Sequence, residues 1–116
     1  MSTNALIAYV DPVTRKATAT VVHWDGYIEH TGNMLAQHYN TPRDAEAICS
    51  MGYLSYVDEN VDIQGGVDTP IKYDSLDEMI RLFNHSYEFE YLYVYFGGQW
   101  SVLSSDHPVY PVNSAA

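Results

Sequence analysis

Two apolar patterns near the N-terminus each predict a β-strand. Residues 5–10 (ALIAYV) form a continuous apolar run of strand length. Residues 17–24 (ATATVVHW) alternate and are rich in β-branched side chains, which favour strands. Asp11 and Pro12 start a turn between the two runs. The pattern therefore predicts an N-terminal β-hairpin, and residues 25–26 (DG) end its second strand.

The spacing of apolar residues becomes helical after this hairpin. Ile28, Gly32, Leu35 and Tyr39 recur at intervals that place them on one face of a predicted helix over residues 27–39. A glycine on that face is less favourable than alanine by about 1 kcal/mol. Its presence indicates that this helix packs closely on the sheet.

Capping residues predict two further helices. Thr41 can cap a short helix that Gly52 is well placed to end. Ser75 and Glu78 form a capping box at the start of a helix over residues 75–84. The apolar residues of this helix follow the i, i+3, i+4, i+7 rule: Leu76, Met79, Ile80 and Phe83.

The C-terminal part of the chain predicts a second hairpin. We interpret residues 53–74, the least regular stretch, as a loop with a short strand at residues 70–73. Residues 89–96 alternate as a strand, and residues 97–98 (GG) supply a tight turn. Residues 100–103 form the return arm.

These elements follow the order ββ-αα-(loop/β)-α-ββ, which predicts an α+β domain. We expect an antiparallel sheet of two hairpins, with roughly four to five strands, packed on one face by two to three helices. The length of 116 residues fits one domain. We place that domain at residues 1–106 and expect residues 107–116 to form a flexible C-terminal tail.

Acidic residues dominate the charge of the chain. Fifteen Asp and Glu residues face five Lys and Arg residues, which gives a net charge of −10 at pH 7. Nucleic acids and anionic membranes repel such a chain, so we expect it to bind neither directly. The charge suits a partner with a basic surface, including a groove that normally holds nucleic acid. It is equally consistent with the ordinary solubility of an acidic intracellular protein.

The compartment is indicated by what the sequence lacks. The N-terminal residues have neither the basic start nor the long apolar block of a signal peptide, and no apolar run reaches membrane-spanning length. One cysteine, Cys49, can form no internal disulfide, which favours a reducing compartment. Cys49 falls in an apolar stretch of a predicted helix, so we interpret it as a small buried hydrophobic residue and not as a nucleophile.

No group of residues indicates catalysis, a cofactor or a metal. Asp58 and Asp62, with an asparagine between them, resemble the first ligands of a calcium loop, but the required glycine and terminal glutamate are absent. His23, Asp25 and His30 are close in sequence, but no further ligand spacing supports them. The chain lacks a glycine-rich phosphate loop and a nucleophile elbow. We therefore predict a non-enzyme without cofactor or metal.

Eleven tyrosines are interleaved with acidic side chains. Period two places Phe89, Tyr91, Tyr93 and Tyr95 on one face of the last long strand. A central strand buried on both faces explains this pattern. An aromatic binding face explains it as well, because tyrosine is enriched in protein interfaces. We predict a partner-binding or homodimer surface made of Tyr53, Tyr56, Asp58, Glu59, Asp62, Asp68, Glu88, Glu90, Tyr91, Tyr93 and Tyr95.

A His-Trp-Asp-Gly-Tyr run at residues 23–27 opens a longer signature. The signature continues with Gly32, Leu35, His38, Tyr39 and Gly52, and later with residues 90–100 (EYLYVYFGGQW). Together these residues resemble a family of small, mostly uncharacterised proteins encoded by tailed bacteriophages. Residues 53–74 depart from that family, because they are acidic where relatives tend to carry a basic histidine-arginine segment. A ligand role of that segment therefore does not carry over.

The same run also has a structural interpretation. It forms the corner between the predicted second strand and the first predicted helix. We expect Trp24 to pack in the core, Asp25 and Gly26 to cap the helix, and Tyr27 to begin it.

The resemblance implies a phage accessory protein, without an activity that transfers residue by residue. Together with the charge, it predicts a protein of the host bacterial cytoplasm that binds and inhibits a host protein. Such a target is plausibly a CRISPR or restriction defence factor, blocked by occupying its basic nucleic-acid-binding surface. Two alternatives stay open: a structural phage protein, and a protein that sequesters a small nucleotide signal. The second would need cations for phosphate, and few are available: Arg15, Lys16, Arg43, Lys72 and Arg81.

Overall fold

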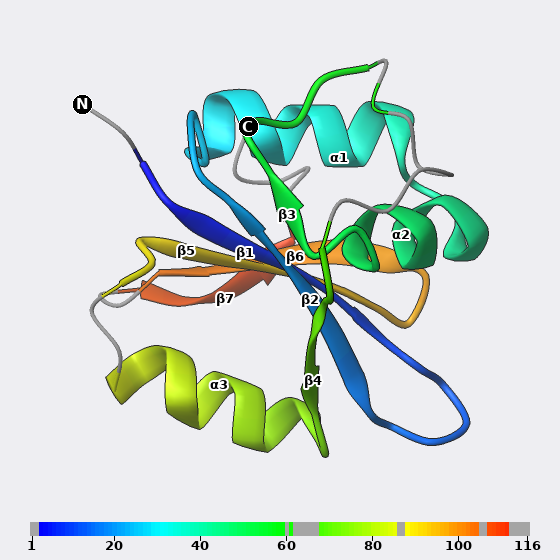
Figure 1. Cartoon of the computed structure of the whole chain (residues 1–116). Coiled ribbons are helices and arrows are strands. Elements are labelled where there is room, and N and C mark those ends of the chain that lie inside the picture. The colour runs from blue at the N-terminus through cyan, green and yellow to red at the C-terminus, as the bar shows by residue number, and fades with distance from the viewer. Residues whose placement is uncertain (1–2, 60, 62–67, 86–87, 105–106, 112–116) are drawn as a thin grey trace.

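A mixed β-sheet forms the middle layer of the molecule, between helices on both of its faces (Figure 1). The computed structural model describes residues 3–59, 61, 68–85, 88–104 and 107–111. The strands of this described part are β1 (Ala5–Val10), β2 (Ala17–Val22), β3 (Tyr53–Leu54), β4 (Ile71–Tyr73), β5 (Tyr91–Phe96), β6 (Gln99–Ser104) and β7 (His107–Pro111). The helical segments are a π-helical turn, η1 (Ile28–Gly32), followed by α1 (Asn33–His38), α2 (Pro42–Cys49) and α3 (Leu76–His85). Among the described residues, none of the helices combines the length and the apolar character that a membrane span requires.

The α+β class predicted from the sequence is confirmed. The strands follow the order β3-β2-β1-β5-β6-β7, and β4 pairs with the opposite end of β2 from β3. β1 lies in the middle, antiparallel to β2 and parallel to β5. Both predicted hairpins, β1–β2 and β5–β6, are present.

The prediction of a fully antiparallel sheet is wrong, because the β1–β5 and β2–β3 pairs are parallel. Parallel neighbours cannot be joined by a tight turn and need a longer crossover connection. The segment η1–α1–α2 joins β2 to β3, and the chain between β1 and β5 runs through β2, β3 and β4 and ends with α3. β4 runs in the same direction as β5, since β4 is antiparallel to β2, and β2 is antiparallel to β1.

The expectation that all helices cover one face is also wrong. Ala5 and Ile7 of β1 belong to the core under α1 and α2, whereas Leu6 and Ala8 belong to the core against α3 (Figure 1). Successive side chains of a strand point to opposite faces, so a strand with a core on each side is apolar at every position. This double burial explains the unbroken apolar run at residues 5–10.

The local signals of the sequence are confirmed where capping and turns decide the structure. The Asp44 N–H donates to the Thr41 hydroxyl at 3.1 Å, which caps α2. The Glu78 N–H donates to the Ser75 hydroxyl at 3.1 Å at the start of α3. Gly97 and Gly98 both have positive φ, as the two-residue turn of the β5–β6 hairpin requires.

Three boundaries differ from the prediction. The helix expected over residues 27–39 is divided into η1 and α1. The predicted loop contains the short strand β3 as well as the expected β4. Residues 107–111, placed in a flexible tail, form β7 and pair with β6, so the domain boundary at residue 106 is wrong.

Candidate protein-interaction surface

The tyrosine-rich strand β5 is a core element and not a binding face. Tyr93 is fully buried and Tyr95 is 4% exposed, both in the core under α1 and α2. The Tyr93 hydroxyl donates to the Gly26 carbonyl at 2.7 Å, and the Tyr95 ring meets the Trp100 ring edge-on at 5.3 Å. The prediction that these two tyrosines contact a partner is therefore wrong, because a double-sided core covers them. Tyr91 is half-buried.

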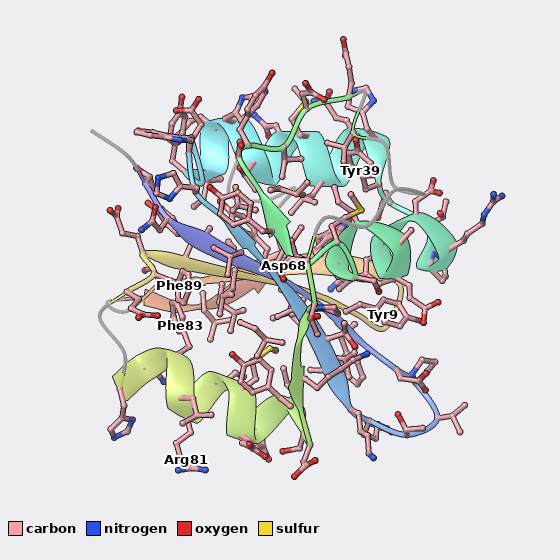
Figure 2. All side chains as sticks on the ribbon, viewed as in Figure 1. Tyr9, Tyr39, Asp68, Arg81, Phe83 and Phe89 are labelled. Carbon is pink, nitrogen blue, oxygen red and sulfur yellow. The ribbon has the colours of Figure 1, made fainter. Side chains whose placement is uncertain are left out.

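Phe89 was predicted on the tyrosine face and lies elsewhere. It packs against the core on the α3 side of the sheet (Figure 2), whereas Tyr91 packs on the other side. The alternation fails here because β5 begins at Tyr91, so Phe89 precedes the strand.

Exposed aromatic side chains gather instead on two short segments of the chain, residues 23–30 and 53–57. Eight large hydrophobic residues are exposed in the described part of the chain, and these two segments supply four of them. Their exposed fractions are 47% for Trp24, 38% for Tyr27, 36% for Tyr53 and 48% for Tyr56. The prediction that Trp24 packs in the core is wrong.

Backbone hydrogen bonds hold the two segments together. The His23 N–H donates to the Leu54 carbonyl at 3.0 Å, and the Trp24 N–H donates to the Ser55 carbonyl at 2.7 Å. These bonds continue the pairing of β2 with β3. The His30 ring Nε2 lies 2.6 Å from the Val57 carbonyl and donates to it, since a carbonyl can only accept.

The turn between Trp24 and Tyr27 is also fixed. Asp25 has a left-handed backbone with φ of 55°, and its carbonyl accepts from the Thr31 hydroxyl at 2.7 Å. The Gly26 N–H donates to the Thr3 carbonyl at 2.9 Å, and a side chain at Gly26 would collide with Ala5. The prediction that Asp25 and Gly26 cap the helix and that Tyr27 begins it is wrong, because Tyr27 is the N-cap residue of η1 and no side chain caps this helix.

The rings form two rows, each with a histidine in the middle. In one row the His23 ring lies 4.7 Å from Trp24 and 6.3 Å from Tyr53. In the other row the His30 ring lies 6.3 Å from both Tyr27 and Tyr56. We call these six residues the aromatic surface: His23, Trp24, Tyr27, His30, Tyr53 and Tyr56.

The aromatic surface lies in acidic stretches of the chain. No lysine or arginine occurs between Lys16 and Arg43 or between Arg43 and Lys72. Asp25 and Glu29 belong to the first segment, and both are exposed. The following acidic pair, residues 58–59, comes directly after the second segment. A cation that approaches these rings therefore meets carboxylates and no lysine or arginine of the two segments.

The chain matches no protein-family model, no curated protein and no solved structure. The resemblance to proteins of tailed bacteriophages therefore stays a prediction.

The structure places the predicted acidic residues in three groups. Asp58 and Glu59 lie beside α1, where the Tyr39 hydroxyl donates to the Asp58 carbonyl and His38 Nε2 lies 3.7 Å from Glu59 Oε2. Glu88 and Glu90 precede β5, and the Glu90 N–H donates to the Asn4 carbonyl at 2.9 Å.

The third group is a single exposed residue. The Asp68 N–H donates to the Met51 carbonyl at 3.0 Å, which places Asp68 beside the short turn between α2 and β3. Asp62 lies outside the described residues.

Other candidate chemistry is limited. No group of three or more His, Cys, Asp or Glu residues that could hold a metal occurs in the described ranges. The calcium-like pattern falls partly outside these ranges. Cys49 is fully buried, as predicted, and burial raises the pKa of its thiol well above the usual value.

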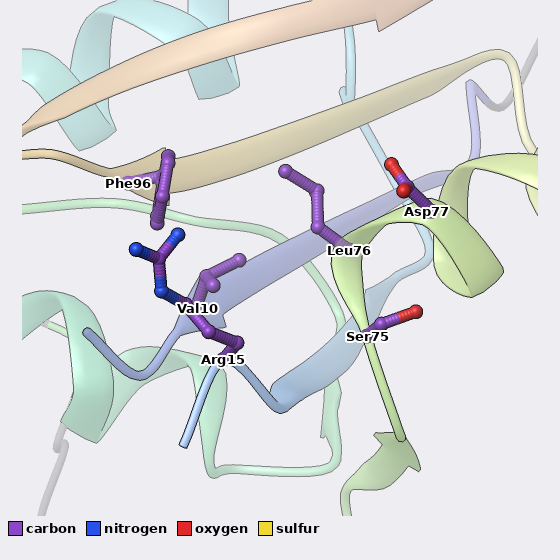
Figure 3. A pocket seen from close by; sticks show the side chains of 6 residues that line it. All are labelled: Val10, Arg15, Ser75, Leu76, Asp77 and Phe96. Carbon is purple, nitrogen blue, oxygen red and sulfur yellow. The ribbon is translucent and has the colours of Figure 1, made fainter. Parts of the chain in front are cut away.

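A separate hollow of about 220 Å³ lies between the β1–β2 turn, the end of β5 and the start of α3 (Figure 3). The Arg15 guanidinium carbon lies 5.5 Å from the centroid of the Phe96 ring, and Asp77 also lines the hollow. A neighbouring hollow contains Lys16 and Lys72. It also contains three acidic residues: Asp11, Glu46 and Asp74. The four carboxylates of the two hollows oppose a phosphate there.

Proposed function

We propose that the protein is an acidic interaction protein that binds and inhibits a host protein with a basic surface. The observation that carries this proposal is the aromatic surface, in which four exposed rings lie on two segments without lysine or arginine. Exposed Trp and Tyr side chains are the residues that most often supply binding energy in protein interfaces. Phage origin and a defence factor as the target rest on the sequence resemblance.

Charge and aromatic contact would have separate roles in such a complex. The net charge of −10 would speed association with a basic partner and would make it sensitive to salt. The rings would supply contact area at short range. A partner whose basic surface normally holds nucleic acid would be blocked, because the acidic protein and the phosphate backbone compete for the same cations.

The test is competition on an identified partner. The protein is used to capture a partner from host lysate, and the purified partner is then assayed for nucleic-acid binding with and without the protein. We expect the protein to displace the nucleic acid, more weakly as salt is raised. A captured partner that keeps its nucleic-acid binding at saturation would contradict the proposal.

Two matched variants, each lacking three negative charges, separate the effect of local charge on binding from the effect of net charge. The first variant neutralises the acidic pair after the aromatic surface together with Asp62 (Asp58→Asn, Glu59→Gln, Asp62→Asn). The second removes the same charge elsewhere, on α2 and around α3 (Glu46→Gln, Asp74→Asn, Asp77→Asn). We expect the first to weaken binding more than the second. Equal losses would indicate that only the net charge matters.

Sequestration of a nucleotide is the second candidate, and one observation favours it. Arg15 lies over the Phe96 ring in the hollow of Figure 3, so a phosphate would meet one cation and a base one aromatic ring there, although Asp77 in the same hollow opposes the phosphate. A thermal-shift screen with cyclic nucleotides tests it, with Arg15→Ala as the control. Absence of any stabilisation would remove this candidate.

A further inference from the structure

The aromatic surface has a geometry that leaves its ring faces accessible. None of its four ring contacts is a parallel stack. The His23 ring makes interplanar angles of 86° with Trp24 and 34° with Tyr53. The His30 ring makes interplanar angles of 55° with Tyr27 and 45° with Tyr56. Rings that meet by their edges or at a tilt do not cover each other's faces as stacked rings do. Trp24 and Tyr56, at the outer ends of the two rows, are also the most exposed members.

We propose that the aromatic surface recognises arginine side chains of the protein partner. This inference rests on the proposed function and names the chemistry of the partner at that site. A guanidinium is planar, stacks on aromatic faces and carries five N–H donors along its edge. It can therefore lie on a ring of the aromatic surface while its edge donates to a nearby oxygen.

Suitable acceptors lie on the same two segments. Asp25 and Glu29 carry exposed carboxylates, and the tyrosines of the surface carry hydroxyls. Lysine fits this arrangement less well, because its ammonium is a compact and strongly hydrated charge without a flat face. Attraction between a cation and a ring is strongest for Trp and is used more often by Arg than by Lys.

Other occupants fit these observations less well. A nucleic acid could stack its bases on the rings, but no lysine or arginine of the two segments would meet its phosphates. A second copy of the chain would bring the same net charge of −10 to the contact. An arginine-bearing protein segment satisfies both the rings and the charge.

The test uses the full-length protein and two synthetic peptides of equal length, one alternating arginine with glycine and the other lysine with glycine. Binding is measured by calorimetry at about 0.15 M NaCl, where long-range attraction is largely screened. We expect the arginine peptide to bind about tenfold more tightly, the size of a partly desolvated contact between a cation and a ring.

Single substitutions test whether the preference for the arginine peptide arises at the aromatic surface. Trp24→Ala and Tyr56→Ala are each expected to reduce the arginine preference to about threefold or less, since each removes one end of a ring row. Tyr56→Phe keeps the ring face and is expected to keep most of the preference. Leu82→Ala is the control, because Leu82 is 44% exposed on α3, which covers the other face of the sheet. Circular dichroism and the melting temperature establish that each variant is folded.

The outcomes separate this inference from the proposed function. Equal affinity for the two peptides overturns arginine recognition but leaves a basic partner in place. Loss of affinity in Leu82→Ala equal to that in Trp24→Ala overturns the location, and no binding to either peptide overturns the inference as a whole. A captured partner that keeps its nucleic acid would contradict the proposed inhibition, while a clear arginine preference would still stand.

Discussion

Gly52 has a backbone conformation and a position that only glycine fits. Its φ is +85°, its N–H donates to the Thr20 hydroxyl at 2.9 Å, and a Cβ here would overlap the Asp68 carbonyl. Gly52→Ala is expected to lower the free energy of unfolding by about 2–4 kcal/mol, since a left-handed backbone and an overpacked contact each destabilise. Urea denaturation measures this change.

Gly97→Ala is the matched control for that substitution. Gly97 also has a positive φ, of +66°, but no atom lies within 4 Å of a Cβ built there. Its replacement should lower the free energy of unfolding only by the contribution of the left-handed backbone, about 1–2 kcal/mol. Equal losses in the two variants would show that contact with Asp68 contributes nothing.

Tyr39 connects α1 to the acidic segment after the aromatic surface and should make stability depend on alkaline pH. Burial raises the pKa of Tyr39 above its usual 10.0, and nearby Asp58 adds to the rise. The unfolded chain therefore loses this proton first as the pH rises. Stability is unaffected below pH 10 and falls as the pH rises through the folded pKa.

Tyr39→Phe tests this dependence in denaturation experiments across pH. The variant loses the hydrogen bond to the Asp58 carbonyl and the one from the Val61 N–H, so it should be less stable at pH 7 by about 1–2 kcal/mol. Its stability should decline less steeply above pH 10. Leu82→Ala, which removes no ionisable group from an exposed position, is the control and should keep the wild-type decline. An unchanged decline in Tyr39→Phe would contradict the assignment.

The role of a single residue could be predicted from the sequence where that residue contacts its near neighbours along the chain. Thr41 and Ser75 cap helices because each hydroxyl meets an N–H three positions along the chain, so a short window contains all the information. The exposure of Trp24 depends on a distant segment, residues 53–57. The density of aromatic residues at 23–27 was the available signal, but the run also fits a structural corner. The sequence therefore does not assign Trp24 and Tyr27 to the predicted surface.

At the scale of elements, α2 depends on its cap, because it has only eight residues. Helices of this length have little stability of their own. Thr41→Ala removes the acceptor of the Asp44 N–H and is expected to lower the free energy of unfolding by about 1 kcal/mol. Thr41→Ser should retain most of it. A melting temperature of Thr41→Ala equal to that of the wild type would show that water replaces the cap without loss.

Pairing between elements was the weakest part of the prediction. Strands β1 and β5 are each recognisable from their own residues, but nothing in either says that Ala5 lies opposite Tyr91 in a parallel pair. The two-residue strand β3 is too short to show any period. In β7, two prolines at Pro108 and Pro111 favour a coil interpretation, although proline is tolerated in edge strands.

At the scale of the whole molecule, the second core decides how the tyrosines are used. A sheet with helices on one face would have left the other face of β5 exposed, as the sequence also allowed. The structure covers both faces, so Tyr93 and Tyr95 serve the core. Exposed aromatic residues then remain at the corner between β2, η1 and β3. Of the residues in the predicted surface, Tyr53 and Tyr56 are exposed at this corner.

Because of the net charge, salt should stabilise the folded protein and weaken its binding to a basic partner. A chain of net charge −10 repels itself when compact, and salt screens that repulsion. The exposed side chains of His38 and Glu59 lie 3.7 Å apart, and exposed pairs of this kind add little attraction for salt to remove. Raising NaCl from about 0.01 to 0.15 M should therefore raise the melting temperature by a few degrees, while binding of the arginine peptide weakens. The Glu46→Gln, Asp74→Asn, Asp77→Asn variant should show a smaller rise. A melting temperature that falls with NaCl would mean that attractive pairs, and not self-repulsion, dominate the folded surface.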